Sequence, residues 1–202
     1  AKPVQTITTP AGVSQVAFGD AGRVAIAGAD RHVRVYGIGD GKLLEDFLAP
    51  NVLLDIAYVG EKRRIAAGGA DNVTYLLTPS LIRAWPAHVG GVAAAAFTSD
   101  GTQLVSAGAD KLVTVWNAAD GKKLATYGGH TAGVTSVALS ADGAKLIAGG
   151  ADKTIQIWDR AAASESPDAP IAPKSTITHT HGIRTVALSN DGKQILAGGD
   201  DN

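Results

Sequence analysis

The sequence predicts an all-β protein built from about five repeated antiparallel sheets. Two motifs predict this fold, because both recur along the chain with one shared period of about 40 residues. The first is a short tetrapeptide rich in Gly and Ala that ends in aspartate, at Asp30, Asp71, Asp110, Asp152 and Asp201, with spacings of 41, 39, 42 and 49 residues. The second is an apolar triplet, at Val16–Phe18, Ile56–Tyr58, Ala95–Phe97, Val137–Leu139 and Val186–Leu188.

Each unit has the pattern of short strands joined by tight turns. Val134–Leu139, Lys145–Ala148 and Thr154–Trp158 are short runs of β-branched or bulky apolar residues, which favour strands. Asp142-Gly143 lies between the first two runs, and glycine adopts the positive φ of such a turn at little cost. We expect four strands per unit. A unit of this size cannot bury both faces alone, so the units must stack radially, as in a β-propeller.

We expect a single domain over residues 1–202, with about four complete blades and a partial fifth. Three of the eight prolines fall in one stretch, so we expect a surface loop there, either a flexible insertion or a loop that binds a partner. The first repeat contains strands near residues 4–8, 13–18, 23–27 and 32–36. The repeats span about 4–36, 43–77, 82–116, 123–158 and 175–202, and the insertion spans 160–174.

These motifs resemble those of the WD-repeat β-propeller family. Trp158-Asp159 follows Asp152 by six residues, and Trp116-Asn117 follows Asp110 by six. Gly129-His130 opens the fourth unit. The resemblance covers the chain from about residue 4 to 202, and the plain repeats rich in Ala and Gly look similar to bacterial members. It implies that a His, a Ser, an Asp and a Trp form a hydrogen-bonded tetrad in each blade, since buried donors need partners.

The tetrad that this resemblance implies is complete only in the third unit. In the fourth unit Ala148 stands in place of the serine, and the fifth unit stops before its Trp. The first two units retain little more than the Asp, so we expect apolar packing to hold those blades. The residues assigned to the tetrad are His88, Ser106, Asp110, Trp116, His130, Asp152, Trp158, His179, Asp201, Asp30 and Asp71.

The number of blades is open between three alternatives. The first is a fragment of a longer propeller, since a seven-blade ring of this period needs about 280 residues. The second is a closed ring of five blades, in which Val4–Thr8 completes the last blade. In the third, a second chain fills the gap, because a partial ring exposes open sheet edges.

Composition and spacing argue against an enzyme, a metal or a cofactor. The net charge of −1 provides no basic face for nucleic acid or an anionic membrane, and no apolar run is long enough for a membrane helix. The absence of cysteine leaves cytoplasm and periplasm equally open. His179 and His181 could share a metal on one strand, but the repeat already explains His179. The Gly37–Gly41 segment matches an ordinary turn, and the periodic aspartates belong to turns rather than to a catalytic pair.

We therefore expect a non-catalytic scaffold that binds other proteins. Repeat architectures offer broad rigid faces, and the resemblance implies that the start of each first strand faces the partner. The candidates there are Ser14, Leu54, Thr135 and Arg184, of which only Arg184 is a usual hot-spot type. Two other hypotheses are an assembly unit that completes a propeller with another chain or copy, and a sensor module fused to an enzyme or electron-transfer domain outside this chain.

Overall fold

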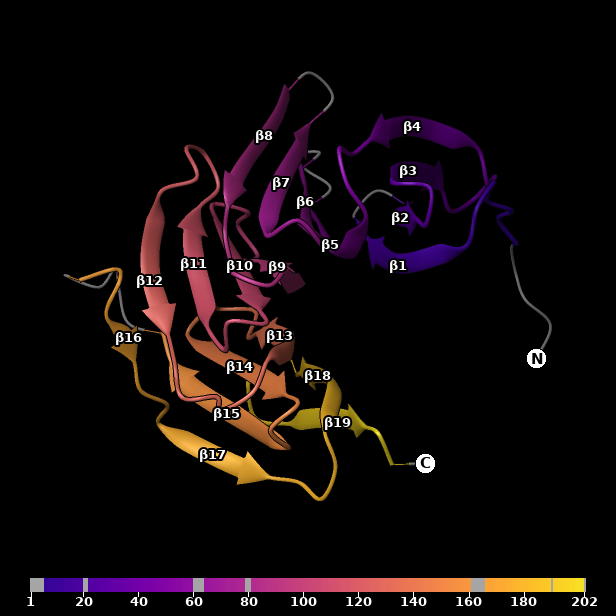
Figure 1. The fold of residues 1–202 in the computed structure, drawn as a ribbon. Helices are drawn as coiled ribbons and strands as arrows, with labels where there is room; N and C mark the ends of the chain where they lie inside the picture. The colour runs from indigo at the N-terminus through magenta and orange to yellow at the C-terminus, as the bar shows by residue number, and fades with distance from the viewer. Residues whose placement is uncertain are drawn as a thin grey trace.

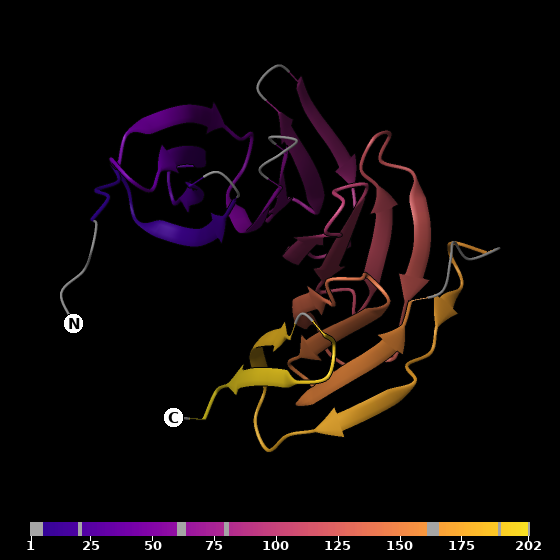
Figure 2. The same ribbon diagram turned by 180° about the vertical axis from the view of Figure 1, so that it is seen from behind.

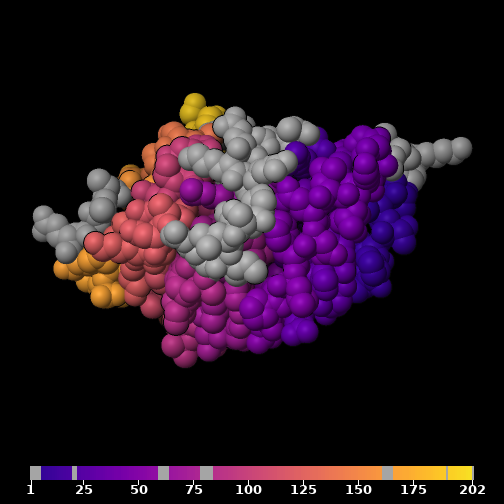
Figure 3. Space-filling model, turned by 90° about the horizontal axis from the view of Figure 1, so that it is seen from above, coloured from indigo at the N-terminus to yellow at the C-terminus, as the bar shows by residue number. Residues whose placement is uncertain are grey.

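The computed structural model describes residues 6–19, 22–59, 64–78, 81–160, 166–189 and 191–201, and the strands in these residues are not accompanied by any helix. Five sheets follow one another in chain order and form an arc (Figure 1). Seen from above, their order along the molecule follows the chain (Figure 3). The first and the last sheet lie at the two ends of the arc (Figure 2). The predicted all-β fold, with four complete blades and a partial fifth, is confirmed.

The first four sheets each contain four antiparallel strands, and the fifth contains two. Sheet 1 consists of β1 (Val13–Phe18), β2 (Arg23–Gly28), β3 (His32–Gly37) and β4 (Leu43–Leu48). Sheet 2 consists of β5 (Leu53–Val59), β6 (Arg64–Gly69), β7 (Val73–Thr78) and β8 (Leu81–Pro86). Sheet 3 contains β9 (Val92–Phe97), β10 (Gln103–Gly108), β11 (Val113–Asn117) and β12 (Lys123–Tyr127). Sheet 4 consists of β13 (Val134–Leu139), β14 (Lys145–Gly150), β15 (Thr154–Asp159) and β17 (Ser175–Thr178), and sheet 5 of β18 (Ile183–Leu188) and β19 (Ile195–Gly199).

The first strand of each sheet carries a β-bulge at its second residue. In sheet 1, Val13 pairs with Gly28 and Gln15 with Ala27, so Ser14 is the extra residue. The same shift in register occurs in the other sheets, where the extra residues are Leu54, Ala93, Thr135 and Arg184. A bulge bends the strand and changes the direction of the bulged side chain. The four candidate partner-binding residues therefore share one structural position.

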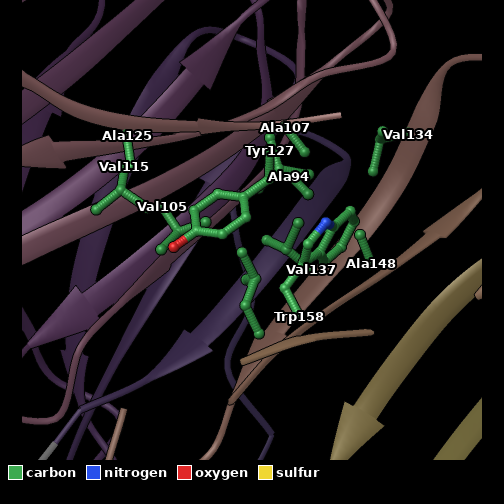
Figure 4. Packing of buried hydrophobic residues seen from close by; sticks show 12 residues of the cluster. Ala94, Val105, Ala107, Val115, Ala125, Tyr127, Val134, Val137, Ala148 and Trp158 are labelled. Atoms are coloured by element: carbon green, nitrogen blue, oxygen red, sulfur yellow. The ribbon is translucent and has the colours of Figure 1, made fainter. Parts of the chain in front are cut away.

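The core lies between neighbouring sheets. Sheets 3 and 4 enclose Tyr127 and Trp158, whose ring centroids are 5.7 Å apart, among small and branched apolar side chains (Figure 4). Glycines on the second strands let the next sheet approach closely. A Cβ atom at Gly149 would lie only 2.4 Å from Cγ2 of Ile183 in the following sheet. Sheets 1 and 2 are joined by a hydrophobic cluster of Ala25, Ala27, Val33, Val35, Ala49, Leu53, Ile56, Ile65, Ala67, Tyr75 and Leu77.

The insertion between β15 and β17 crosses from sheet 4 to sheet 3. Its strand β16 (Pro170–Ile171) pairs in parallel with β12 and becomes the fifth strand of sheet 3. The hydroxyl of Thr126 donates to the carbonyl of Pro167 at 2.7 Å, and Lys123 forms an ion pair with Asp168 at 2.7 Å. The part of the expected surface loop that the structure describes therefore packs against a blade. Residues 161–165 lie outside the described residues.

The strand expected near residues 4–8 is not formed by the described part of that segment. Residues 6–8 are irregular, and residues 4 and 5 lie outside the described residues. Ile7 packs instead against the face of sheet 1, over Val24, Ile26 and Tyr36. The outer edge of sheet 1 is already occupied by β4, and β19 pairs with β18 alone. The closed five-blade ring required residues 4–8 to complete the last blade. Residues 6–8 do not do so.

Candidate functional site

Sheet 3 brings all four residues of its expected tetrad together. Trp116 Nε1 on β11 donates to Ser106 Oγ on β10 at 2.7 Å, and Ser106 Oγ lies 2.8 Å from His88 Nε2. His88 Nδ1 lies 2.9 Å from Asp110 in the turn between these strands. With the Nδ1 proton directed at Asp110, Nε2 is left to accept the serine proton, so each donor has one acceptor. The tetrad joins the segment before β9 to the two central strands.

Asp110 is the charged residue of this network and accepts the hydrogen bond from His88. Burial raises the pKa of its carboxyl group, but the hydrogen bonds from His88 and from the backbone of Leu112 and Val89 outweigh burial, and the pKa lies below its ordinary value. The backbone N–H groups of Val89 and Leu112 also donate to Asp110, at 3.3 and 3.2 Å. The hydrogen bonds that the carboxylate accepts from His88, Val89 and Leu112 hold two turns together.

Sheet 4 forms only half of the network. His130 Nδ1 lies 3.0 Å from Asp152, as in sheet 3, but Ala148 occupies the position of the serine. The buried Nε2 atom of His130 consequently has no hydrogen-bond partner. Trp158 donates to the carbonyl of Ile171 at 3.2 Å instead, while its ring lies 6.2 Å from that of His130. The insertion thus provides the acceptor that the missing serine would have provided.

The tetrad residues of sheet 5 lie farther apart. His179 Nε2 is 3.6 Å from Asp201, and His181 Nδ1 is 3.9 Å from the same carboxylate. Both imidazoles are partly exposed, with 39% and 55% of the side-chain surface accessible. Water can therefore replace either contact, and this arrangement holds the last blade less firmly than the buried pairs of sheets 3 and 4.

The aspartates of sheets 1 and 2 have partners that sequence reasoning missed. Arg34 donates to both oxygens of Asp30, at 3.2 and 2.7 Å, and this interaction lowers the pKa of Asp30 to about 2. In sheet 2, the hydroxyl of Tyr75 donates to Asp71. Both donors stand four residues after the aspartate and replace the missing histidine. The periodic alignment places Arg34 and Tyr75 at the same position as Thr114 and Gln156 of sheets 3 and 4, but it does not indicate that they bind the aspartates.

The four candidate partner-binding residues lie at the bulges, at one end of the first strands. Ser14 donates to the carbonyl of Ala27 at 3.0 Å within its own sheet. Thr135 bonds to the carbonyl of Ile183 at 2.6 Å and thereby joins sheets 4 and 5. Arg184 forms an ion pair with Asp200, although 73% of its side chain is exposed. Leu54 is 44% exposed, and among the four residues only Thr135 is half-buried.

A buried carboxylate at the first strand of sheet 2 connects three sheets. Asp55 accepts a hydrogen bond from Gln15 Nε2 of sheet 1 at 2.6 Å. It accepts a second one from the backbone N–H of Ala95 of sheet 3, also at 2.6 Å. Burial raises the pKa of Asp55 above its ordinary value, and the hydrogen bonds from Ala95 and Gln15 offset only part of this effect. The charged form of Asp55 is therefore destabilised in the folded protein.

Substituting Asp55 with asparagine should change how stability depends on pH. The folded-state pKa lies above the unfolded value of 3.8, so the folded protein binds the extra proton and loses stability as the pH rises through that window. The D55N variant does not lose stability in this way, because asparagine does not ionise. The melting temperature of D55N minus that of the wild type should therefore increase from pH 4 to pH 7.5. A difference in melting temperature that is constant or decreases over this pH range would contradict a raised pKa of Asp55 in the folded protein.

The stacked sheets and the tetrad define a β-propeller protein of the WD type. The WD domain, G-beta repeat family (WD40) matches residues 1–37, 79–117, 121–159 and 172–202. These segments make up more than half of the chain, so the chain belongs to the WD40 repeat family. The unmatched residues 38–78 include β5–β7, whose sheet retains only Asp71 of the tetrad. WD40 repeats generally mediate protein–protein interactions and are generally non-catalytic. No curated protein matches this chain.

The described residues contain neither a cluster of metal ligands nor a membrane-spanning helix. No group of three or more histidine, aspartate or glutamate side chains in these residues is arranged to hold a metal ion. Within the same residues there is no helix with the length and hydrophobicity needed to cross a bilayer.

Proposed function

We propose that this chain is a non-catalytic scaffold that binds protein partners through the bulged ends of its first strands. The proposal rests on the tetrad of sheet 3, in which His88, Ser106 and Asp110 are all committed to internal hydrogen bonds. Side chains that could act as base or nucleophile elsewhere are used here to hold strands in place. A stack of sheets held in this way provides a rigid surface, which reduces the entropy lost when a partner binds.

Leu54 and Arg184 are the residues through which we expect most of the binding energy to act. Leu54 exposes an apolar side chain beside Gly91, and its Cδ1 lies 3.7 Å from the position of a Cβ atom there. Arg184 is paired with Asp200 at the surface, and an exposed ion pair of this kind costs little to open. Arginine is also enriched among interface hot spots. The expected partner is a protein that offers an apolar group and a carboxylate or carbonyl oxygen.

A binding measurement tests this proposal. A partner is first captured by chemical cross-linking in an extract of the cells that make this protein, and is identified by mass spectrometry. Its affinity is then measured by calorimetry. Leu54→Arg and Arg184→Ala should each weaken the affinity by about ten-fold.

Lys42→Ala provides the matched control. Lys42 is exposed in the turn before β4, at the opposite end of the strands from the bulges. This substitution should leave the affinity unchanged. If L54R and R184A bind the partner as tightly as the wild type does, the bulged ends are not the binding surface.

A second candidate function is an assembly unit whose partner is another copy of the chain. It is favoured by the large apolar side chains exposed on the two end sheets, Phe18 and Leu196, both of which are 73% exposed. Such surfaces are typical of sites where another protein packs. A measurement of the mass in solution separates the two candidates, because a scaffold is a monomer without its partner and an assembly unit associates with itself.

A further inference from the structure

Among the described residues, no sheet packs on the side of sheet 1 where each later sheet has the sheet before it. We call the side of a sheet that points to the sheet before it the preceding face, and the opposite side the following face. The fourth residue of each first strand lies on the preceding face, and Ile56, Val137 and Val186 are 4%, 9% and 6% exposed there. In sheet 1 the equivalent residue Val16 is 42% exposed, and Phe18 two residues later is 73% exposed.

The sheet at the end of the arc exposes an apolar side chain on its following face. Leu196 of β19 pairs with Ala187 of β18. The residues in the same register of the preceding sheets are Val105 and Ile147, which are fully buried against the next sheet. Leu196, by contrast, is 73% exposed, and no sheet of the described residues packs against it on this face.

An open hollow marks where an aromatic ring would fit on this following face. At the junction of sheets 1 and 2, the ring of Tyr58 lies on Gly19, since a Cβ atom at Gly19 would be only 1.7 Å from Tyr58 Cε1. Phe18 is the equivalent of Tyr58 in sheet 1, and Ser189 is the equivalent of Gly19 in sheet 5. Around Ser189 is a hollow of about 690 Å³, lined also by Ala187, Leu188, Gln194, Ile195 and Leu196.

We propose that two copies of this chain associate head to tail, with the preceding face of sheet 1 in one copy on the following face of sheet 5 in the other. Phe18 of one copy fills the hollow beside Ser189 of its partner. The contact continues the junction that already joins neighbouring sheets within the chain. It joins two different surfaces, so the interface is heterologous. This inference rests on the assembly function proposed above.

The charges on the preceding face of sheet 1 do not oppose this contact. Arg34 is the buried cation there, and it is neutralised by Asp30 at 2.7 Å and Asp46 at 3.4 Å. His32 Nδ1 lies 2.6 Å from the same Asp46. Ile7 covers Val24, Ile26 and Tyr36, so the free apolar surface is concentrated at Val16 and Phe18, close to the first strand.

Sedimentation velocity over a wide range of concentration tests the proposal. The wild type should associate, and Phe18→Glu or Leu196→Glu should each weaken association about ten-fold or more, because each places a carboxylate in the apolar contact. Val89→Glu is the matched control, since Val89 is 79% exposed but lies on neither end face. Circular dichroism should show that all three variants remain folded, as expected for exposed positions.

A mixing experiment tests the head-to-tail geometry. F18E retains an intact sheet 5, and L196E retains an intact sheet 1, so a mixture of the two variants should form a one-to-one complex that neither forms alone. A mixture that stays monomeric, or an L196E variant that associates like the wild type, would overturn the geometry. A wild type that is monomeric at every concentration would overturn the assembly function itself. Association that is unaffected by F18E would overturn only the surface proposed here.

Discussion

Replacing Trp158 with alanine should lower the free energy of unfolding by about 3–5 kcal/mol. Trp158 is the largest fully buried side chain of the described residues, with 1% of its surface exposed. Its ring contacts Tyr127 and His130 between sheets 3 and 4, and its indole N–H donates to Ile171 of the insertion. Alanine would leave a cavity and an unpaired carbonyl at the same place. Urea denaturation followed by circular dichroism measures the loss without depending on tryptophan fluorescence.

Trp158→Phe separates the packing from the hydrogen bond. Phenylalanine keeps an aromatic ring beside Tyr127 but cannot donate to Ile171, so we expect a loss of about 1–2 kcal/mol. A W158A variant whose unfolding free energy stays within about 1 kcal/mol of the wild type would show that sheets 3 and 4 do not pack through this residue.

The fold could be predicted because the same pattern of short strands and tight turns recurs five times along the chain. Each Asp-Gly turn and each apolar triplet is weak evidence alone, but their shared period fixes the strand order within a sheet. The outer strand β4 (Leu43–Leu48) joins sheet 1 although it belongs to the second sequence repeat. Neighbouring sheets approach closely at small residues of this repeated tetrapeptide, and Gly149 beside Ile183 is an example.

The insertion and the first residues could not be predicted in the same way, because neither repeats. Pro170 and Ile171 form a strand only because β12 offers an unpaired edge, which is a property of the assembled sheet. Ile7 lies on sheet 1 because an apolar surface is exposed there, over Val24 and Ile26. Both outcomes depend on tertiary contacts, and the local sequence contains no signal for them.

The tetrad was only partly predictable for a related reason. The family resemblance supplied residue types for each position, and sheet 3 places His88 and Ser106 within hydrogen-bond distance. Compensation by another residue type is not contained in such a pattern. Arg34 and Tyr75 take over the role of the histidine because a half-buried aspartate needs a donor, and any side chain of suitable length at that position can provide it.

Removing the hydroxyl of Ser106 should lower the free energy of unfolding by about 2 kcal/mol. Ser106 is fully buried, and its Oγ atom is the partner of both His88 Nε2 and Trp116 Nε1. Ser106→Ala leaves both of these atoms buried without a partner, which costs more than the loss of one hydrogen bond. Ser175→Ala on the exposed strand β17 is the control and should change the unfolding free energy by less than about 0.5 kcal/mol.

The reciprocal substitution, Ala148→Ser, should raise the free energy of unfolding by about 1 kcal/mol. It places a hydroxyl next to His130 Nε2, which has no partner, and the pairing of Nδ1 with Asp152 leaves Nε2 as an acceptor. The gain should be smaller than the loss in S106A, because Trp158 already donates to Ile171 and has little to gain from a new acceptor. Thermal unfolding of the two variants and of their double mutant checks this, and the two effects should add, since the residues lie in different sheets. A destabilised A148S variant would mean that the site has no room for the oxygen, and that sheets 3 and 4 differ in more than one missing serine.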